Sequence, residues 1–552
     1  MNQANKWEND WEYWLVALGT AVGFGCIWRF PYIVYNNGGA VFLIPYYIFM
    51  FGFGIPQQFL ETTVGQYFRE SLIDTYSKVS WKYLGVAVTS MLVSGVMSIY
   101  YIYIMAYCLI YLVAGFGTLP WMYGEEKDIL EHTRKFYMEK VVQLNPNKDE
   151  LGGWNWPLVL SVLVCWIIVF LCIRKGTEQT GKIALITVCM PYVLLVIFLI
   201  RVSMLDGFSN GIVYLLKPDF SKLFTLQIWK DALIQVFFQL SLGQGCMITF
   251  ASFRDVKEKI VLPTRLIPLI NSFTGLLASF IIFGYLGYFC QKYDHDINSL
   301  QIAGPGLIFI TFPACLSTMG MPHLFMFLFF VTMVLLGIDT QFALVETVCY
   351  MVEDVSMKIR KRELDPQLVR GGICLVTFFI GLPIATQGGP YLIDLLDTFG
   401  YSIPASVTNL LEIYIWVKIT DFDKGVKKLM AVTEEEIPKQ DMYCLDYSSF
   451  WVMCVMLAVC VYLTFRDGIF GEKFTAGFSL AGIIILALML LPPIYYFILH
   501  SDEPVHTDPY SGTLDTHHRH RLLSYEEVGS DYNDSPSMSS NKKALKELNI
   551  LA

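Results

Sequence analysis

The sequence predicts an all-α integral membrane protein of about twelve transmembrane helices, with helices 1 and 6 broken near their middles. Three observations support this fold class. The chain has 552 residues, of which 55% are hydrophobic and 16% charged, whereas soluble proteins have roughly 25% charged residues. Apolar stretches of about 18 to 25 residues, which can cross ~30 Å of hydrocarbon, recur along it. Two glycine pairs, Gly23 with Gly25 and Gly243 with Gly245, interrupt two of these stretches.

The predicted spans are the apolar stretches that are long enough to form a membrane-crossing helix. They lie near residues 14–35, 41–66, 84–114, 157–173, 183–202, 230–252, 264–289, 323–350, 371–387, 391–417, 450–465 and 476–499. An even number of spans places both termini on the same side of the membrane.

The short loops between the spans predict the orientation, because lysine and arginine accumulate on the cytoplasmic side of a membrane. One set of loops is rich in basic residues, and the opposite set contains very few. The basic loops contain Arg69, Lys78, Lys82, Arg174, Lys175, Lys182, Arg254, Lys257, Lys259, Lys358, Arg360, Lys361, Arg362, Lys424, Lys427 and Lys428. We therefore expect both termini to be cytoplasmic, in a protein of the plasma membrane.

The two glycine pairs predict how the spans are grouped. In hydrocarbon every backbone polar group needs a partner, so a loosened helix is tolerated only where it lines a cavity enclosed by protein. Two such breaks at matching positions are typical of secondary transporters built from inverted repeats. We expect a transmembrane core over 14–418, with helices 1–5 at 14–202 and helices 6–10 at 230–418. Helices 11 and 12 (450–499) follow it.

The two ends of the chain lie outside the predicted spans. Residues 1–13 are expected to form the cytoplasmic N-terminus. The polar residues 500–552 are rich in Ser, Asp, Glu and His, so they are expected to form a disordered cytoplasmic tail.

Few ionisable side chains lie inside the spans, and each is a functional candidate because a charge there must be paired or hydrated. Asp339, followed by Thr340, offers hard oxygen ligands to a small cation. An unwound helix also presents free carbonyls to a cation and free N–H groups to an anion. At Gly23 and Gly25 this combination suits a zwitterionic amino acid, so we expect small-molecule amino-acid substrates.

Other classes of function have little support. No nucleophile with a neighbouring base, phosphate-binding loop or metal-ligand spacing indicates an enzyme, and nothing indicates nucleic-acid binding. Most of the thirteen cysteines lie within apolar spans, where cysteine packs as a small hydrophobic residue. Membrane lipid and the transported amino acid are the expected partners.

Seven short motifs, in order along helices 1–10, resemble those of the neurotransmitter:sodium symporter family, which includes a bacterial leucine transporter with broken helices. The motifs are Ala21-Val22-Gly23-Phe24-Gly25-Cys26-Ile27-Trp28-Arg29-Phe30-Pro31-Tyr32, Asn37-Gly38-Gly39 with Ile44-Pro45-Tyr46, Ile99-Tyr100-Tyr101, Phe237-Phe238-Gln239-Leu240-Ser241-Leu242-Gly243, Ala303-Gly304-Pro305-Gly306, Leu336-Gly337-Ile338-Asp339 and Gly381-Leu382-Pro383. The resemblance implies the fold of that leucine transporter, with two inverted repeats of five helices.

The resemblance also implies the positions of the binding sites. One sodium site, the second in family usage, would use the carbonyls of Gly19, Val22 and Leu336 with the side chains of Asp339 and Thr340. The first sodium site would involve Ala21, Gln239 and Asn271. The substrate would lie between Ala21, Gly23, Gly25, Met97, Tyr101, Phe238, Gln239, Ser241, Gln244, Thr340 and Leu344. Arg29 with Asp397 would form the outer gate, and Trp7 and Asp354 match the inner gate.

Several of these positions depart from the family pattern. Cys26 stands where the family has an asparagine that binds the first sodium, and a thiol is a poor ligand for a hard cation. Gln239 replaces a Ser or Thr there and could still supply an amide oxygen. In the chloride site Gly275 replaces a serine, although Tyr46 and Gln235 remain. This speaks against chloride dependence.

Three further positions bear on specificity and gating. Monoamine carriers have an aspartate at the position of Gly23, so glycine favours amino acids. Gln244 replaces an aromatic residue, and it could bind a polar substrate side chain or the unwound backbone. The inner-gate arginine is replaced by Ala4, for which Lys6 could substitute.

We therefore expect a sodium-coupled symporter of amino acids, with neutral ones favoured, that works by alternating access and has one well-formed sodium site. The alternatives are an amino-acid sensor and an uncoupled or proton-coupled carrier.

Overall fold

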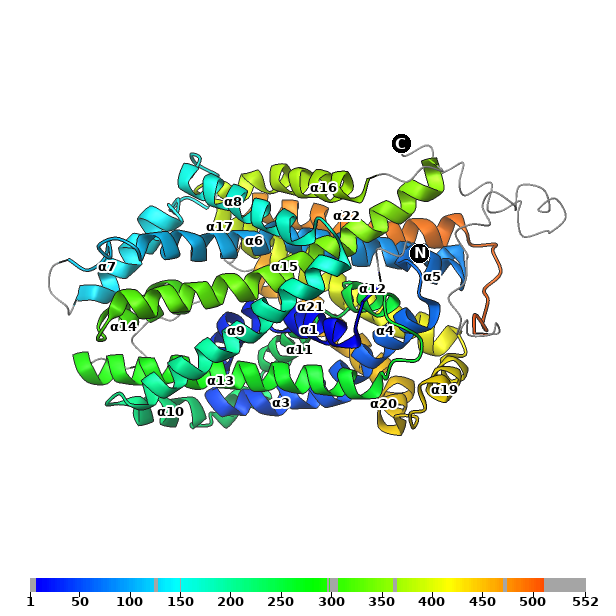
Figure 1. Ribbon diagram of the computed structural model, residues 1–552, viewed down its shortest axis with the longest axis horizontal. Coiled ribbons are helices and arrows are strands. Elements are labelled where there is room, and N and C mark those ends of the chain that lie inside the picture. The colour runs from blue at the N-terminus through cyan, green and yellow to red at the C-terminus, as the bar shows by residue number, and fades with distance from the viewer. Residues whose placement is uncertain are drawn as a thin grey trace.

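The computed structural model describes residues 6–123, 128–148, 150–294, 297, 306–360, 365–469 and 474–510. Within these ranges the protein is built from helices and contains no β-strand; a single bridge joins Trp154 and Thr386. Most of the long helices run along the long axis of the molecule and form one bundle (Figure 1). The predicted all-α fold class is confirmed.

Nine helices of the described residues are long and apolar enough to cross a membrane, and one bent pair, Asp10–Ala21 with Gly25–Asn36, makes a tenth. The nine are Gly39–Phe68, Trp81–Ala114, Trp156–Ile173, Gln179–Ser203, Val261–Tyr293, Pro322–Lys358, Pro366–Ala385, Lys439–Arg466 and Ala476–Leu499. The remaining two predicted spans, 230–252 and 391–417, do not belong to this group.

The structure explains why these two predicted spans are not continuous apolar helices. The first is divided between α11 (Leu226–Leu240) and α12 (Cys246–Ser252), each too short to span a membrane alone. The second changes its winding through α17 (Gly389–Leu395), η12 (Leu396–Ser402), α18 (Ile403–Ile413) and η13 (Tyr414–Ile419). It carries acidic residues, including Asp397 and Glu412, in its interior. Hydropathy alone therefore finds ten spans where twelve were predicted.

Both glycine pairs lie at helix breaks. Helix α1 (Asp10–Ala21) ends where Val22 leaves the helical conformation, and the chain resumes as η2 (Gly25–Arg29) and α2 (Phe30–Asn36) with a bend of 41°. Between α11 and α12 the backbone is left-handed at Ser241, Gly243 and Gly245, with φ of 52°, 69° and 76°. Glycine adopts this conformation without steric cost, so the pair allows the second break.

The broken helix α1 lies in the middle of the bundle (Figure 1). It packs against α9 (Thr177–Ser203), α13 (Val261–Tyr293) and α15 (Pro322–Arg360). A second long helix, α6 (Leu84–Ala114), packs along α15. The break in α1 is therefore enclosed by protein, as unpaired backbone in a membrane requires.

Small residues allow some helices to approach closely. On α4 (Ile55–Phe68), a Cβ added to Gly65 would lie 2.3 Å from the carbonyl oxygen of Ile248 on α12. On α10 (Phe208–Leu216), one added to Gly211 would overlap the carbonyl oxygen of Phe283 on α13. Such contacts stabilise membrane helices, because lipid provides no hydrophobic force between them.

The basic loops gather at one end of the bundle, where Figure 1 shows α5 (Leu72–Ser77), α19 (Phe422–Thr433) and α20 (Lys439–Tyr443). Helices α7 (Ile129–Phe136) and α14 (Phe312–Ser317) lie at the opposite end (Figure 1). The Trp7 amide donates to the carbonyl of Phe253 at 3.4 Å, and the His506 amide donates to that of Val79 at 2.8 Å. The segments next to both termini therefore contact the basic end.

Within the predicted tail, the described residues after Ser501 pack against the helices of the basic end. The Tyr510 ring is fully buried, stacks edge-on against Tyr67 at 4.9 Å and lies over Gly425, which has no side chain to exclude it. Burial of an aromatic ring stabilises this segment in spite of its polar composition. The rest of the predicted tail, residues 511–552, lies outside the described residues, as do Ala4 and the motif residues Ala303, Gly304 and Pro305.

Candidate substrate and sodium site

The centre of the site is the break in α1, where Gly23 is closely surrounded. A Cβ added to Gly23 would lie 2.3 Å from Thr340 Oγ1 and 2.6 Å from the Tyr101 hydroxyl oxygen. A larger residue at this position would therefore require the Thr340 and Tyr101 side chains to move. Gly25 is similarly confined by the Phe238 ring, 2.8 Å from the position of an added Cβ.

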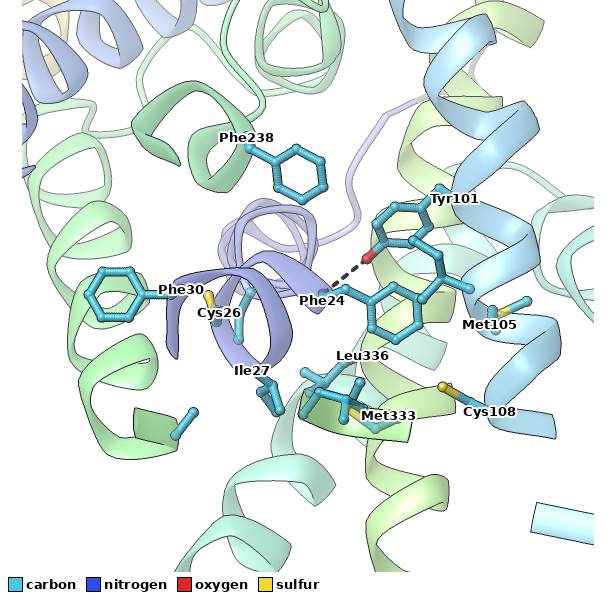
Figure 2. Packing of buried hydrophobic residues seen from close by; sticks show 14 of the residues in the cluster. Phe24, Cys26, Ile27, Phe30, Tyr101, Met105, Cys108, Phe238, Met333 and Leu336 are labelled. Carbon is cyan, nitrogen blue, oxygen red and sulfur yellow. Dashed lines mark hydrogen bonds between the residues drawn. The ribbon is translucent and has the colours of Figure 1, made fainter. Parts of the chain in front are cut away.

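The Tyr101 hydroxyl lies at the exposed backbone of the break. It accepts a hydrogen bond from the Phe24 amide at 3.1 Å, and the two rings stack with centroids 4.8 Å apart (Figure 2). The Tyr101 hydroxyl also has a hydrogen bond with the Thr340 side chain, and the Phe24 amide belongs to a turn without regular helical bonding. These two groups can together hold a carboxylate.

The Phe238 ring lies above Tyr101 and the broken helix (Figure 2). The Arg29 guanidinium lies over this ring, 4.5 Å from its centroid, and pairs with Asp397 at 3.4 Å. The Tyr100 hydroxyl also donates to Asp397 at 3.0 Å. The two residues expected at the outer gate are therefore paired, and the guanidinium of Arg29 lies over the Phe238 ring.

The other predicted substrate residues are also buried in the described part of the chain. They are Ala21, Met97, Gln239, Ser241, Gln244 and Leu344. The Gln244 side chain donates to the Tyr401 hydroxyl at 3.2 Å, while the Gln244 backbone carbonyl accepts from Ser94 at 2.7 Å. The sequence left two roles open for Gln244, a bond to the substrate or to the unwound backbone. In the structure its side chain bonds instead to η12, the element that carries Asp397.

The predicted second sodium site brings its residues together between α1 and α15. Gly19 faces Asp339, since a Cβ added to Gly19 would lie 3.1 Å from Asp339 Cγ. The Thr340 hydroxyl donates to the carbonyls of Gly19 and Thr20 at 3.5 and 3.4 Å. Val22 and Leu336 are buried beside them.

Asp339 is fully buried, and only one of its oxygens is used. Oδ1 accepts a hydrogen bond from Thr187 on α9, whereas Oδ2 accepts none from the described residues. An unpaired carboxylate in a membrane interior is costly, so this donor set suits a monovalent cation with hard oxygen ligands.

The predicted first sodium site differs from the second, because its polar groups form hydrogen bonds with one another. The Asn271 side-chain amide donates to the carbonyls of Ala21 and Gln239 at 2.9 and 2.8 Å. Its oxygen accepts from the Cys26 thiol at 2.9 Å. The oxygens that could coordinate an ion are therefore engaged in hydrogen bonds.

The residues of the predicted chloride site are also engaged. The Tyr46 hydroxyl donates to the Gln239 side-chain oxygen at 2.6 Å, and Gln235 donates to the Gly25 carbonyl at 2.9 Å. At Gly275, an added Cβ would meet the Phe30 ring at 3.1 Å and Gln239 Nε2 at 3.4 Å. The Gln239 oxygen, expected as a possible sodium ligand, is held by Tyr46.

At the inner gate, Trp7 and Asp354 take part in separate contacts. The Trp7 indole donates to the Phe250 carbonyl at 3.0 Å. Asp354 accepts from Ser71 at 2.5 Å and from Lys358 at 2.6 Å, so it links α15 to α5. Lys6 pairs with Asp255 at 3.3 Å.

The sequence did not single out two residues of the site, Thr187 and Tyr401. Thr187 is a hydroxyl residue within an apolar span, which is a weak signal because threonine often bonds its own helix, as Thr187 also does. Tyr401 lies within the irregular winding of η12, and its ring packs edge-on against Phe238 at 5.7 Å. Only the fold brings either residue to the site.

Comparison with known proteins identifies the family of this chain. Residues 4–502 match the sequence model described as "Sodium:neurotransmitter symporter family". The chain is 34% identical over 425 residues to the sodium- and chloride-dependent taurine transporter of Bos taurus, covering 72% of this chain and 68% of that protein. It is 33% identical over 422 residues to the sodium- and chloride-dependent GABA transporter 2 of Rattus norvegicus, covering 72% and 70%.

Proposed function

This chain belongs to the sodium:neurotransmitter symporter family, and from that premise we propose that it carries a neutral amino acid with one sodium ion and independently of chloride. Members of the family are transporters and not enzymes. The observation that carries the proposal is the contrast between two groups of oxygens. Asp339 Oδ2 is left without a donor among the described residues, whereas the Asn271, Ala21 and Gln239 oxygens near Cys26 each accept a hydrogen bond.

The sodium ion would bind at Asp339, with the Thr340 hydroxyl and the carbonyls of Gly19, Val22 and Leu336 completing the coordination. Binding there would connect α1 to α15 across the bundle. Because the two helices belong to different halves of the core, an ion between them would favour one arrangement of the halves over another.

The substrate would be a zwitterion held at the break in α1. Its carboxylate would meet the Tyr101 hydroxyl and the backbone N–H groups near Gly23, and its ammonium the free carbonyls of the unwound segments. The relatives are named for taurine and GABA, which are small zwitterions. Gly23 also supplies no carboxylate of the kind that monoamine carriers have at this position, which supports an amino acid as the substrate.

Independence of chloride would separate this chain from those relatives, whose names include chloride. Gly275 supplies no hydroxyl, and Tyr46 and Gln235 use their donors within the protein. The tight cluster around Gln239 supports the absence of both the first sodium ion and chloride.

The proposed location is the plasma membrane with both termini in the cytoplasm. The basic short loops support this orientation. The contacts of Trp7 and His506 at the same end of the bundle agree with it.

A proton-coupled carrier is the second candidate, because two buried carboxyl groups, Glu61 and Glu412, lie near the second break. Glu61 accepts from the Gly243 amide at 2.9 Å, and Glu412 accepts from Gln57 at 2.9 Å. Two buried like charges repel strongly, which favours a shared proton. A proton gradient that drives uptake without sodium would favour this candidate.

The experiment is amino-acid uptake into proteoliposomes with sodium or choline outside, and with chloride or gluconate as the anion. We expect uptake to require sodium and to be unchanged in gluconate. Asp339→Asn should lower the apparent sodium affinity by about 100-fold, or about 3 kcal/mol, because the ion loses the buried negative charge of Asp339. Undiminished uptake in choline would exclude sodium coupling, and a large loss in gluconate would exclude independence of chloride.

A further inference from the structure

The loop between α12 and α13 contains a fully buried arginine that the transport site does not use. Arg254 has no exposed side-chain surface. Its Nη1 donates to Gln66 on α4 at 2.7 Å, and its Nη2 donates to the carbonyl of Lys259 at 2.9 Å. A buried guanidinium also needs a counter-charge, because an unpaired charge in a protein interior is very costly.

The counter-charge comes from the first turn of α1. Asp10 Oδ1 accepts from Arg254 Nη2 at 2.6 Å and from Nε at 2.9 Å, and Asp10 Oδ2 accepts from the Trp14 indole at 3.0 Å. The Arg254 guanidinium also lies over the Tyr13 ring, 4.2 Å from its centroid. We call Asp10 and Arg254 the cytoplasmic clasp.

The clasp holds the part of α1 that can move independently. Helix α1 ends at Ala21, and the chain bends by 41° across the break. The twelve residues from Asp10 to Ala21 therefore form a rigid rod about 18 Å long, at 1.5 Å per residue. Gly19, near one end of this rod, faces Asp339, and the clasp holds the other end.

The geometry points to Asp10 and Arg254 as the positioning residues that keep the cytoplasmic side of the transport pathway closed. This inference rests on the proposed function, because only a carrier with alternating access needs the α1 rod to leave and return. When Asp10 and Arg254 separate, residues 10–21 of α1 lose their bond to the loop after α12 and, through Arg254, their connection to Gln66 on α4. Their separation also leaves a buried arginine without its partner, so the closed state is favoured while the clasp is intact.

Asp354, the residue expected at the inner gate, has no hydrogen bond or ion pair to α1 among the described residues. Its partners Ser71 and Lys358 belong to α5 and α15, so its bonds leave α1 unrestrained. The N-terminal segment has a second ion pair to the same loop, Lys6 with Asp255 at 3.3 Å, but both side chains are largely exposed, at 45% and 36%. Exposed ion pairs contribute little.

The Lys6 and Asp255 pair is therefore a matched control for the clasp. Burial would raise the pKa of Asp255, but the Lys257 amide and Lys6 outweigh this effect and the pKa is lowered. The control pair is thus charged at neutral pH, as the clasp is, and it joins the same two segments. The pairs differ chiefly in burial.

The test is hydrogen exchange of the full-length protein in lipid nanodiscs, in sodium and in potassium, combined with sodium-dependent uptake. Asp10→Asn and Arg254→Gln should each raise amide exchange in residues 10–21 by about tenfold or more through local opening. They should leave amide exchange in α7 and α14 at the opposite end unchanged.

In the uptake assay, the same two variants should lower the apparent affinity for external sodium, while the exchange of substrate across the membrane is retained. The control variants K6Q and D255N should match the wild type.

The charge-swap double variant, Asp10→Arg with Arg254→Asp, should recover part of the lost protection. If Arg254 variants do not fold, the wild type still tests the inference, since residues 10–21 and 253–260 should gain exchange together when potassium replaces sodium. Three results would each overturn the inference. The Asp10→Asn variant could keep wild-type protection, the two segments could exchange independently, or the control variants could have the same effect as the clasp variants. A wild type without sodium-driven uptake would refute the proposed function instead, because the exchange data do not depend on transport.

Discussion

Cys26 is the single residue that most distinguishes this site, since its thiol donates to Asn271 where an oxygen ligand would be required for an ion. A carboxamide there would supply such an oxygen beside the Ala21 carbonyl. We predict that Cys26→Asn makes the sodium dependence of uptake steeper. The apparent sodium affinity should rise by roughly fivefold, or about 1 kcal/mol.

Cys26→Ala is the control, because it removes the thiol donor without adding an oxygen. Its sodium dependence should stay as steep as that of the wild type. Equal curves for Cys26→Asn and Cys26→Ala, measured as initial uptake rates over a range of sodium concentrations, would contradict our interpretation of the first site.

At the residue scale, the sequence was most informative where chemistry restricts the choice of side chain. Asp339 could be predicted because an acid in an apolar span is rare, and Gly23 because a glycine pair loosens a helix. The engagement of Gln239 by Tyr46 could not be predicted, since a glutamine oxygen can accept from a proton donor or bind an ion equally well. The clasp was hidden because Asp10 and Arg254 each resemble an ordinary charged residue at the end of a span.

At the scale of the elements, the close contact between α4 and α12 depends on Gly65, whose added Cβ would lie 2.3 Å from the Ile248 carbonyl oxygen. Backbone atoms cannot move aside as a side-chain tip can. We therefore predict that Gly65→Ala destabilises the protein by about 1–3 kcal/mol through overpacking. Thermal unfolding in detergent would show this as a lower transition temperature.

Gly52→Ala provides the matched control on the preceding helical segment, η4 (Met50–Gly54), because an added Cβ at Gly52 would meet no atom within 4 Å. Its transition temperature should not fall below that of the wild type. A Gly65→Ala protein as stable as Gly52→Ala would show that α4 and α12 can separate without cost.

The elements themselves could be predicted from hydropathy in most cases, because a helix that faces lipid must be apolar along its length. The exceptions are instructive. The span near 230–252 is divided by left-handed residues at Ser241, Gly243 and Gly245. The burial of Tyr510 likewise depends on contacts with residues far away in the sequence, Tyr67 and Gly425. Tertiary packing decides such cases, and local composition does not reveal it.

For the whole molecule, the structure combines the ion pair of Arg29 with Asp397, the expected outer-gate residues, and the clasp of Asp10 with Arg254. We infer that each pair closes one side of the transport pathway. The break in α1 lies between the two closures. Both closures are ion pairs that reach the broken helix from opposite directions, so opening one side does not require the other to open. This arrangement suits alternating access, in which only one side of the pathway is open at a time.

The central claim is that one sodium ion, bound at Asp339, accompanies each amino acid across the membrane and that chloride takes no part. The most direct measurement is the simultaneous uptake of radioactive sodium and radioactive amino acid by the same proteoliposomes, in chloride-free buffer. We predict substrate-dependent sodium uptake with one ion for each amino acid. Amino-acid uptake without sodium uptake, two sodium ions for each amino acid, or a requirement for added chloride would contradict the claim.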